Sequence, residues 1–119
     1  MALSSNILGI DVGSVSIHMA VLTYDRNIVH TETCYHYGEI KQCLSKLLEN
    51  IDIKNIHYVA VTDATPSIIQ RNKSYDEQLT INRAAKHYHE IFGAILHIGG
   101  EKFSLSRFDE DRNYMGTRH

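Results

Sequence analysis

The series of short apolar stretches that opens the chain constrains its fold most strongly. Residues 7–12 form a near-continuous apolar run, which is typical of a central strand buried on both faces. Residues 15–23 alternate between two faces, and residues 28–37 are rich in β-branched and aromatic side chains. Turn signals stand between these stretches, at Gly13-Ser14 and at residues 24–27. The sequence therefore predicts a three-stranded antiparallel meander.

The hydrophobic period changes after the meander. Between residues 39 and 50 the apolar side chains recur at intervals of three and four, which predicts an amphipathic helix. Residues 57–62 predict a fourth strand. Because a helix separates it from the meander, we expect this strand to lie parallel to the first one. The expected order in the sheet is third, second, first and fourth strand.

The remaining segments are shorter. We expect a loop over residues 63–75, a second helix over 78–92, and a hairpin of strands 94–98 and 102–108. The helices lie either one on each face of the sheet or both on one face. These elements predict an α/β fold with a mixed sheet and crossover helices.

Composition limits the classes of protein. A chain of 119 residues with 43% hydrophobic residues can form one domain with a real core, or part of one. Its formal net charge of −2 disfavours binding to nucleic acid by phosphate neutralisation. No apolar run reaches the length of a membrane span. Residues 1–6 are polar and lack the charged and apolar blocks of an export leader, so we expect a cytoplasmic protein.

The cysteines and histidines do not suggest a metal site. Cys34 and Cys43 have no metal or redox spacing, and we expect two free thiols with a packing role. The eight histidines are spread over different predicted strands and helix faces, so solvated or hydrogen-bonded side chains are the expectation.

Asp11 is the first candidate for chemistry. Its carboxylate lies near the end of the most apolar predicted strand, where an ionised group is costly unless it is paired or binds a metal. Two interpretations stay open. Asp11 caps the following turn through nearby backbone amides, or it faces a phosphate and its Mg²⁺. Magnesium keeps several waters, so one carboxylate can serve it.

Two glycine turns are the next candidates. Gly13-Ser14 lies between two predicted antiparallel strands, where a tight turn can direct amides at phosphate oxygens. Gly99-Gly100 lies between the strands of the predicted hairpin. Each of them is also explained as an ordinary hairpin connection. Taken together, the two turns could hold a nucleotide phosphate from two sides.

A family resemblance rests on these residues. The segment Gly9-Ile10-Asp11-Val12-Gly13-Ser14 is similar to the first phosphate motif of the actin–hexokinase–Hsp70 ATPase superfamily, and Ile98-Gly99-Gly100 resembles the second. Residues 82–89 and 93–103 resemble the ATP-dependent activators of 2-hydroxyacyl-CoA dehydratases and the related benzoyl-CoA reductase ATPase subunits. The chain looks most like the first, less typical activator-like module of large multidomain members, over residues 7–118.

The resemblance implies a ribonuclease-H-like, or actin-like ATPase, half-lobe. Residues 1–93 would form the first lobe, and residues 94–119 the truncated start of a second lobe. The implied function is the N-terminal, nucleotide-phosphate-binding portion of an ATPase activator that drives electron transfer to a 2-hydroxyacyl-CoA dehydratase-type enzyme. The implied partners are that acyl-CoA dehydratase-type component and a second copy in a homodimer, with neither nucleic acid nor membrane.

The resemblance also assigns the site. Asp11 would be the catalytic residue and would hold Mg²⁺ through water. ATP would be bound by Gly9, Asp11, Gly13, Ser14, Gly99 and Gly100. The family's iron–sulfur cluster takes its ligand from a Cys-Ala-Ala-Gly motif, which this sequence does not contain. Since the lobe that holds adenosine is also missing, we expect the 119-residue chain alone not to turn over ATP.

Some positions depart from the family pattern. Typical activators have a lysine near His18, an aspartate at the place of His97, and Gln-Asp where this chain has Glu101-Lys102. Histidine is a weaker, titratable substitute for lysine. The changes around residue 97 put a second Mg²⁺ contact in doubt. They favour an alternative, a non-catalytic interaction module of the same fold that has lost its ATPase chemistry.

Overall fold

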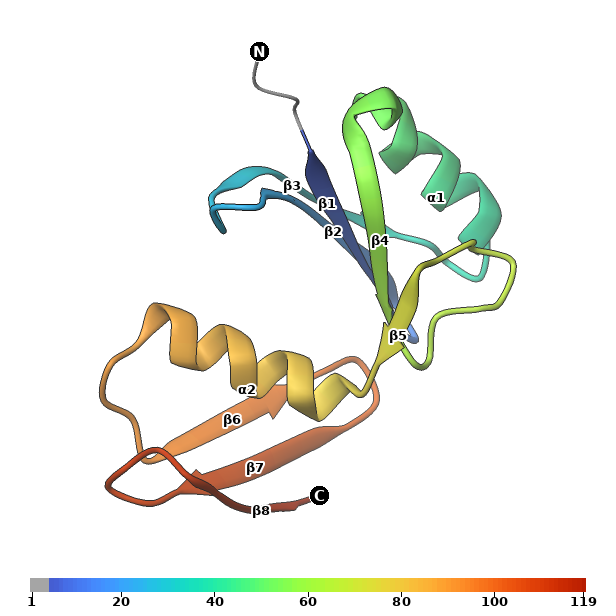
Figure 1. Cartoon of the computed structure of the whole chain (residues 1–119). Coiled ribbons are helices and arrows are strands. Elements are labelled where there is room, and N and C mark those ends of the chain that lie inside the picture. Colours follow the sequence, from blue (N-terminus) through green and yellow to red (C-terminus); the bar gives the residue numbers. More distant parts are fainter. Residues whose placement is uncertain (1–4) are drawn as a thin grey trace. The chain divides into compact units, whose positions relative to one another are not determined.

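The structure is a computed structural model that describes residues 5–119. Residues 1–4 belong to the N-terminal stretch that we expected to lack an export leader, and they lie outside the described residues. The chain forms two compact units, one ending at Tyr75 and one beginning at Asp76 (Figure 1). The boundary between lobes predicted at residues 93 and 94 stays a prediction. Each unit is described by itself.

The first unit is built on a five-stranded mixed sheet with strand order β3-β2-β1-β4-β5 (Figure 1). Its strands are β1 (Asn6–Val12), β2 (Ser16–Thr23), β3 (Ile28–Tyr35), β4 (Ile56–Thr62) and β5 (Lys73–Tyr75), and its helices are α1 (Ile40–Glu49) and the short 3₁₀ turn η1 (Ile53–Asn55). Strand β1 pairs antiparallel with β2 and parallel with β4, and β2 pairs antiparallel with β3. The predicted meander, the parallel fourth strand and the order of these four strands are confirmed.

The core lies between this sheet and α1. The pleat directs Leu8, Ile10 and Val12 of β1 to one face, where they are buried with side chains of α1, among them Leu47. On the other face of β1, Asp11 and its neighbours are only half-buried. The full burial of β1 on both faces that its apolar run predicted is therefore wrong for the face that carries Asp11. That face can offer polar atoms to a ligand.

The segment predicted as a loop over residues 63–75 contains a strand. Residues 73–75 pair parallel with the end of β4 and form the edge strand β5. The side chain of Arg71 fixes the preceding turn, because its guanidinium donates to the carbonyl oxygens of Thr65, Pro66 and Ile69. A three-residue strand carries too little periodicity to be found in the sequence.

The second unit is a helix packed with an antiparallel sheet of order β6-β7-β8. Its elements are α2 (Glu77–Tyr88), β6 (Ala94–Ile98), β7 (Phe103–Phe108) and β8 (Tyr114–Arg118). The hairpin of β6 and β7 was predicted, whereas β8 was not. Strand β8 contains Gly116 with a φ of 132°, and its pairing with β7 shifts register between Arg107 and Phe108. A glycine at an irregular pairing masks the period-two pattern of a strand.

Helix α2 is shorter than predicted. Asp76 caps its N-terminus by accepting a hydrogen bond from the amide of Leu79 at 3.1 Å. The helix ends at Tyr88 rather than at residue 92, because His89 already has an extended backbone. Arg112 then donates to the carbonyl oxygen of His89 at 3.0 Å, which satisfies a group that the helix leaves free.

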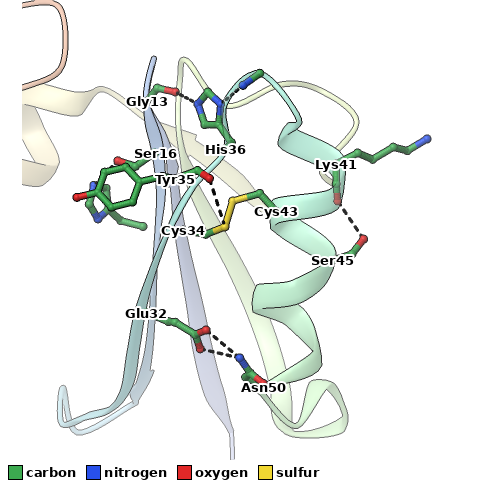
Figure 2. Close-up of a disulfide and its surroundings, with 12 residues drawn as sticks. Gly13, Ser16, Glu32, Cys34, Tyr35, His36, Lys41, Cys43, Ser45 and Asn50 are labelled. Carbon is green, nitrogen blue, oxygen red and sulfur yellow. Dashed lines mark hydrogen bonds between the residues drawn. A yellow bond between two sulfur atoms is a disulfide. The ribbon is translucent and has the colours of Figure 1, made fainter.

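A disulfide joins Cys34 of β3 to Cys43 of α1 (Figure 2). The expectation of two free thiols is therefore wrong. The Cα atoms are 6.1 Å apart, which is within the range that a disulfide requires. The reason is tertiary, since α1 packs beside β3 and brings together two residues nine positions apart. The cytoplasmic location stays a prediction, but free thiols no longer support it.

None of the helices in the described residues 5–119 is long and apolar enough to cross a membrane.

Candidate functional site

Asp11 lies at the carboxyl end of β1, next to the carboxyl end of β4. Because β1 and β4 are parallel, these ends share one edge of the sheet, which is where ligands bind in open α/β sheets. The Oδ1 atom of Asp11 accepts a hydrogen bond from the hydroxyl of Thr62 at 2.8 Å. In the described part of the chain, the carboxylate bonds to this side chain rather than to amides of the following turn, so the capping interpretation of Asp11 is not supported.

A chain of hydrogen bonds fixes this carboxylate. The Oγ1 atoms of Thr62 and Thr65 are 3.1 Å apart, and the amide of Val12 donates to Oγ1 of Thr65 at 3.3 Å. Each hydroxyl has one hydrogen. Since Thr62 gives its hydrogen to Asp11, the hydroxyl of Thr65 must donate to Thr62. The chain runs from the Val12 amide through both threonines to Asp11, and it leaves Oδ2 of Asp11 for a ligand.

The turn after β1, which we call the phosphate turn, comprises Gly13, Ser14, Val15 and Ser16. It closes through a hydrogen bond of 2.9 Å from the amide of Gly13 to the carbonyl oxygen of Ser16. Ser14 and Val15 are exposed at its tip. Within residues 5–119, the amides of Ser14 and Val15 donate to no protein acceptor. Such amides can bind an anion.

Packing within the chain does not explain Gly9. A Cβ atom built there would lie 3.8 Å from the carbonyl oxygen of Ala20, which is an ordinary contact. The free space beside Asp11 therefore suits a group from outside the chain that approaches the backbone closely.

His18 is the direct neighbour of Asp11 across the pair of β1 and β2. Directly opposed residues of an antiparallel pair place their side chains on the same face. The ring of His18 is held on both sides, by the hydroxyl of Ser16 at 3.1 Å and by the hydroxyl of Thr33 at 2.9 Å. The position where the family pattern has a nearby lysine is thus filled by an imidazole within reach of the same edge of the sheet.

The second glycine turn has the same closure as the phosphate turn. The amide of Gly99 donates to the carbonyl oxygen of Lys102 at 2.8 Å, with Gly100 and Glu101 exposed at the tip. This turn belongs to the second unit, whereas Asp11 and the phosphate turn belong to the first. The structure thus brings Gly9, Asp11, Gly13 and Ser14 together on one strand and its turn, and a ligand shared with Gly99 and Gly100 stays a prediction.

Two of the residues that depart from the family pattern, His97 and Lys102, lie close to the carboxylate of Glu77. Glu77 of α2 lies 3.7 Å from Nδ1 of His97 and 3.9 Å from Nζ of Lys102. In residues 5–119, no group of three or more histidine, cysteine, aspartate or glutamate residues could hold a metal ion. A magnesium ion at Asp11 would need phosphate and water oxygens to complete its shell, which is the usual way in which Mg²⁺ binds with a nucleotide.

Solved structures share this fold, although no protein-family model and no curated protein matches the chain. The activator of the 2-hydroxyisocaproyl-CoA dehydratase from Clostridium difficile with bound ADPNP matches 95% of the chain at 20% identity, with a TM-score of 0.78. The (R)-2-hydroxyglutaryl-CoA dehydratase component A of Acidaminococcus fermentans matches 94% at 18% identity, with a TM-score of 0.77. The ethanolamine utilization protein EutJ from Carboxydothermus hydrogenoformans matches 95% at 13% identity, with a TM-score of 0.65.

The chain has an actin-like ATPase fold. The fold class expected from the family resemblance is thereby confirmed. The chain covers 44% of the Clostridium difficile activator and 46% of the Acidaminococcus fermentans protein, which is less than half of each. At these sequence identities the likeness concerns the fold, and the roles of single residues stay predictions.

An iron–sulfur cluster does not fit the cysteines of this chain. Such a cluster is held by four thiolates. Both cysteines of the chain lie in the Cys34–Cys43 disulfide, so the described residues offer no free thiol.

Proposed function

We propose that this chain is the nucleotide-phosphate-binding portion of an ATPase activator that drives electron transfer to a 2-hydroxyacyl-CoA dehydratase-type enzyme. The observation that carries the proposal is the carboxylate of Asp11 at the end of β1, with one oxygen bonded to Thr62 and a turn with two free amides directly after it. The likeness in fold to a dehydratase activator solved with bound ADPNP and to a dehydratase component A supports the same function.

The residues of the site fit a nucleotide with magnesium. Oδ2 of Asp11 would hold Mg²⁺ through a water molecule, and the amides of Ser14 and Val15 would donate to phosphate oxygens. Gly9 and Gly13 would let the phosphates approach the backbone, and the Gly99-Gly100 turn stays a candidate phosphate turn of the second unit. When bound, Mg²⁺ supplies charge neutralisation at the phosphates. The proposed partner is an acyl-CoA dehydratase-type component.

Nucleotide binding tests the proposal. We expect titration of the chain with ADPNP and Mg²⁺, followed by calorimetry, to give saturable binding that requires the metal. Asp11→Asn keeps the shape of the side chain and removes its charge, and it should weaken binding roughly tenfold or more. Asp25→Asn is the matched control, because Asp25 is exposed in the turn between β2 and β3. Equal binding by the two variants would remove Asp11 from the site.

The contacts of Glu77 with His97 and Lys102 favour a second function. Glu77 lies within 4 Å of His97 and of Lys102, two positions beside the Gly99-Gly100 turn where the family pattern has other residues. A chain that has exchanged these residues could serve as a non-catalytic interaction module. Absence of any ADPNP binding, in a chain whose fold is verified by its circular dichroism spectrum, would support this second function over the first.

A further inference from the structure

His36 connects the loop between β3 and α1 to the phosphate turn. The side chain is 7% exposed, and both of its ring nitrogens are bonded (Figure 2). The amide of Gly38 donates to Nδ1 at 2.9 Å, so Nδ1 is the acceptor and the ring hydrogen is on Nε2. Nε2 then donates to the carbonyl oxygen of Gly13 at 2.9 Å. The tautomer follows from the two partners.

The backbone of His36 makes a second connection to the same turn. Its amide donates to the carbonyl oxygen of Val15 at 3.1 Å. The two bonds from His36 reach the carbonyl groups on either side of Ser14. Holding these carbonyl groups fixes the peptide planes that they share with the amides of Ser14 and of Ser16. His36 therefore helps to set the direction of the Ser14 amide, which is one of the two amides proposed to bind phosphate.

The disulfide closes the loop that carries His36. Cys34 lies two residues before His36, and Cys43 lies in the first turns of α1 and is 4% exposed (Figure 2). Between them the chain passes through two left-handed positions, Tyr37 with a φ of 48° and Gly38 with a φ of 84°. Tyr37 is 90% exposed, so the contacts of His36 and the disulfide at its ends are what hold this loop. The cross-link thus limits how far His36 can move from the turn.

We propose that His36 is a positioning residue for the phosphate turn and that the Cys34–Cys43 disulfide holds it there, so that the chain binds nucleotide phosphates more tightly in the disulfide form than in the dithiol form. The statement about nucleotides rests on the proposed function. In the redox step a dithiol reductant gives two electrons and two protons to the disulfide. The S–S bond breaks, two thiols form, and the reductant becomes a disulfide.

The first experiment needs no nucleotide. Nitrogen NMR of labelled chain reports the ring tautomer of His36 and the amide of Ser14, which shares a peptide plane with the Gly13 carbonyl group, with and without a dithiol reductant. We expect reduction to broaden or shift both signals. The variant with Cys34→Ser and Cys43→Ser together should give the NMR signals of the reduced chain, and the reductant should not change them. Signals of His36 and Ser14 that are the same in both redox forms would overturn the proposal, and this result does not depend on a variant that folds.

Two substitutions separate positioning from a general packing role. A glutamine side chain can place its amide donor near the position of Nε2, whereas the shorter asparagine side chain reaches only the position of Nδ1. We expect His36→Gln to keep the wild-type signal of the Ser14 amide and His36→Asn to change it, although both replace a buried ring by an amide. His57→Asn is the control, because His57 is exposed on β4 and should leave the turn unchanged. Identical effects of Gln and Asn would contradict the positioning role.

Binding of ADPNP with Mg²⁺ then tests the functional consequence. Loss of one hydrogen bond that orients the turn should weaken binding about fivefold on reduction and in His36→Asn, and less in His36→Gln. Equal affinity in both redox forms would overturn the redox part while leaving the proposed function intact. If ADPNP binds in no form, the proposed function fails, and the NMR signals of the turn alone decide whether the disulfide positions it through His36.

Discussion

The hydroxyl of Thr62 donates to Oδ1 of Asp11 over 2.8 Å, and this bond joins the ends of two parallel strands at the candidate site. Thr62 is 6% exposed, so its hydroxyl depends on protein partners rather than on water. The bond leaves the carboxylate with one committed oxygen and one oxygen for a ligand. Its energy contributes to stability, and its direction fixes where the free oxygen lies.

The first prediction concerns Thr62→Val. Valine keeps the shape of the side chain and its preference for a strand, but it leaves Oδ1 of Asp11 without its donor and the buried hydroxyl hydrogen of Thr65 without its acceptor. We expect the free energy of unfolding to fall by about 1–2 kcal/mol, measured by urea denaturation. Thr31→Val on β3 is the control, since Thr31 is exposed and should change stability by less than about 0.5 kcal/mol. Equal stability of Thr62→Val and wild type would mean that the hydrogen-bond chain carries no net energy.

The second prediction is a pH dependence from Asp109. The backbone amide of Asn113 donates to its carboxylate, as do the side chain of Asn113 and the amide of Asp111, and these bonds lower the pKa of Asp109 from its ordinary value of 3.8. Because the folded pKa is below the unfolded one, the stability from Asp109 is complete above the ordinary value. It is lost as the pH falls through the folded pKa.

Carbon NMR of the carboxyl group would show this midpoint below 3.8. In urea denaturation at a series of pH values, Asp109→Asn should lose less stability than wild type between about pH 5 and pH 2. Glu110→Gln is a neighbouring control, because Glu110 is exposed in the same turn and should leave the titration of Asp109 in place. A midpoint of Asp109 at or above 3.8 would contradict the prediction.

The fold was predicted where side chains repeat with a clear period. The alternating strands of the meander, the stripe of α1 and the hairpin around Gly99 have enough residues to define a period of two or of three to four. Strand β5 is too short for that, and β8 is interrupted at Gly116. The sequence therefore predicted the four strands that form most of the first sheet. It missed one edge strand of each sheet, β5 in the first and β8 in the second.

The site was predicted only in its ligand-facing part. Asp11 stood out because a carboxylate is rare in an apolar strand, and Gly13 because it marks a turn. Thr62 and Thr65 did not stand out, because a threonine at the end of a strand is common. The partner of Thr62, Asp11, is also 51 positions away in the sequence. His36 and the disulfide were missed for the same reason. Their meaning lies in contacts between segments, which spacing along the chain does not reveal.

The third prediction concerns the disulfide and stability. The bond closes a loop with a sequence separation of nine residues. In the chain-entropy model it lowers the entropy of the unfolded chain, which raises the free energy of unfolding by about 2–3 kcal/mol. We expect a reductant to lower the urea midpoint of wild type accordingly. The variant with Cys34→Ser and Cys43→Ser together should show no response to the reductant. A wild-type midpoint that the reductant leaves unchanged, with free thiols verified by titration, would refute the prediction.

The last prediction concerns self-association through the second unit. Strand pairing places Leu96 opposite Leu105 and Ile98 opposite Phe103 on one face of the sheet, and these side chains are exposed by 61%, 40%, 74% and 64% respectively. An exposed apolar face of this kind, on a hairpin from residue 94 to 108, favours contact with a second copy. We expect a homodimer or a domain-swapped pair at micromolar concentration, for which about 800 Å² per partner would be enough.

Light scattering separates this dimer from a monomer of 13.6 kDa. Phe103→Asp and Leu105→Asp together should dissociate it, because the interface would have to bury two unpaired carboxylates. Ile53→Asp is the matched control, since Ile53 is also exposed, by 60%, but belongs to the first unit. A mass of one chain over a wide concentration range would rule out the dimer. A dimer that survives the double substitution but not Ile53→Asp would place the contact on the first unit instead.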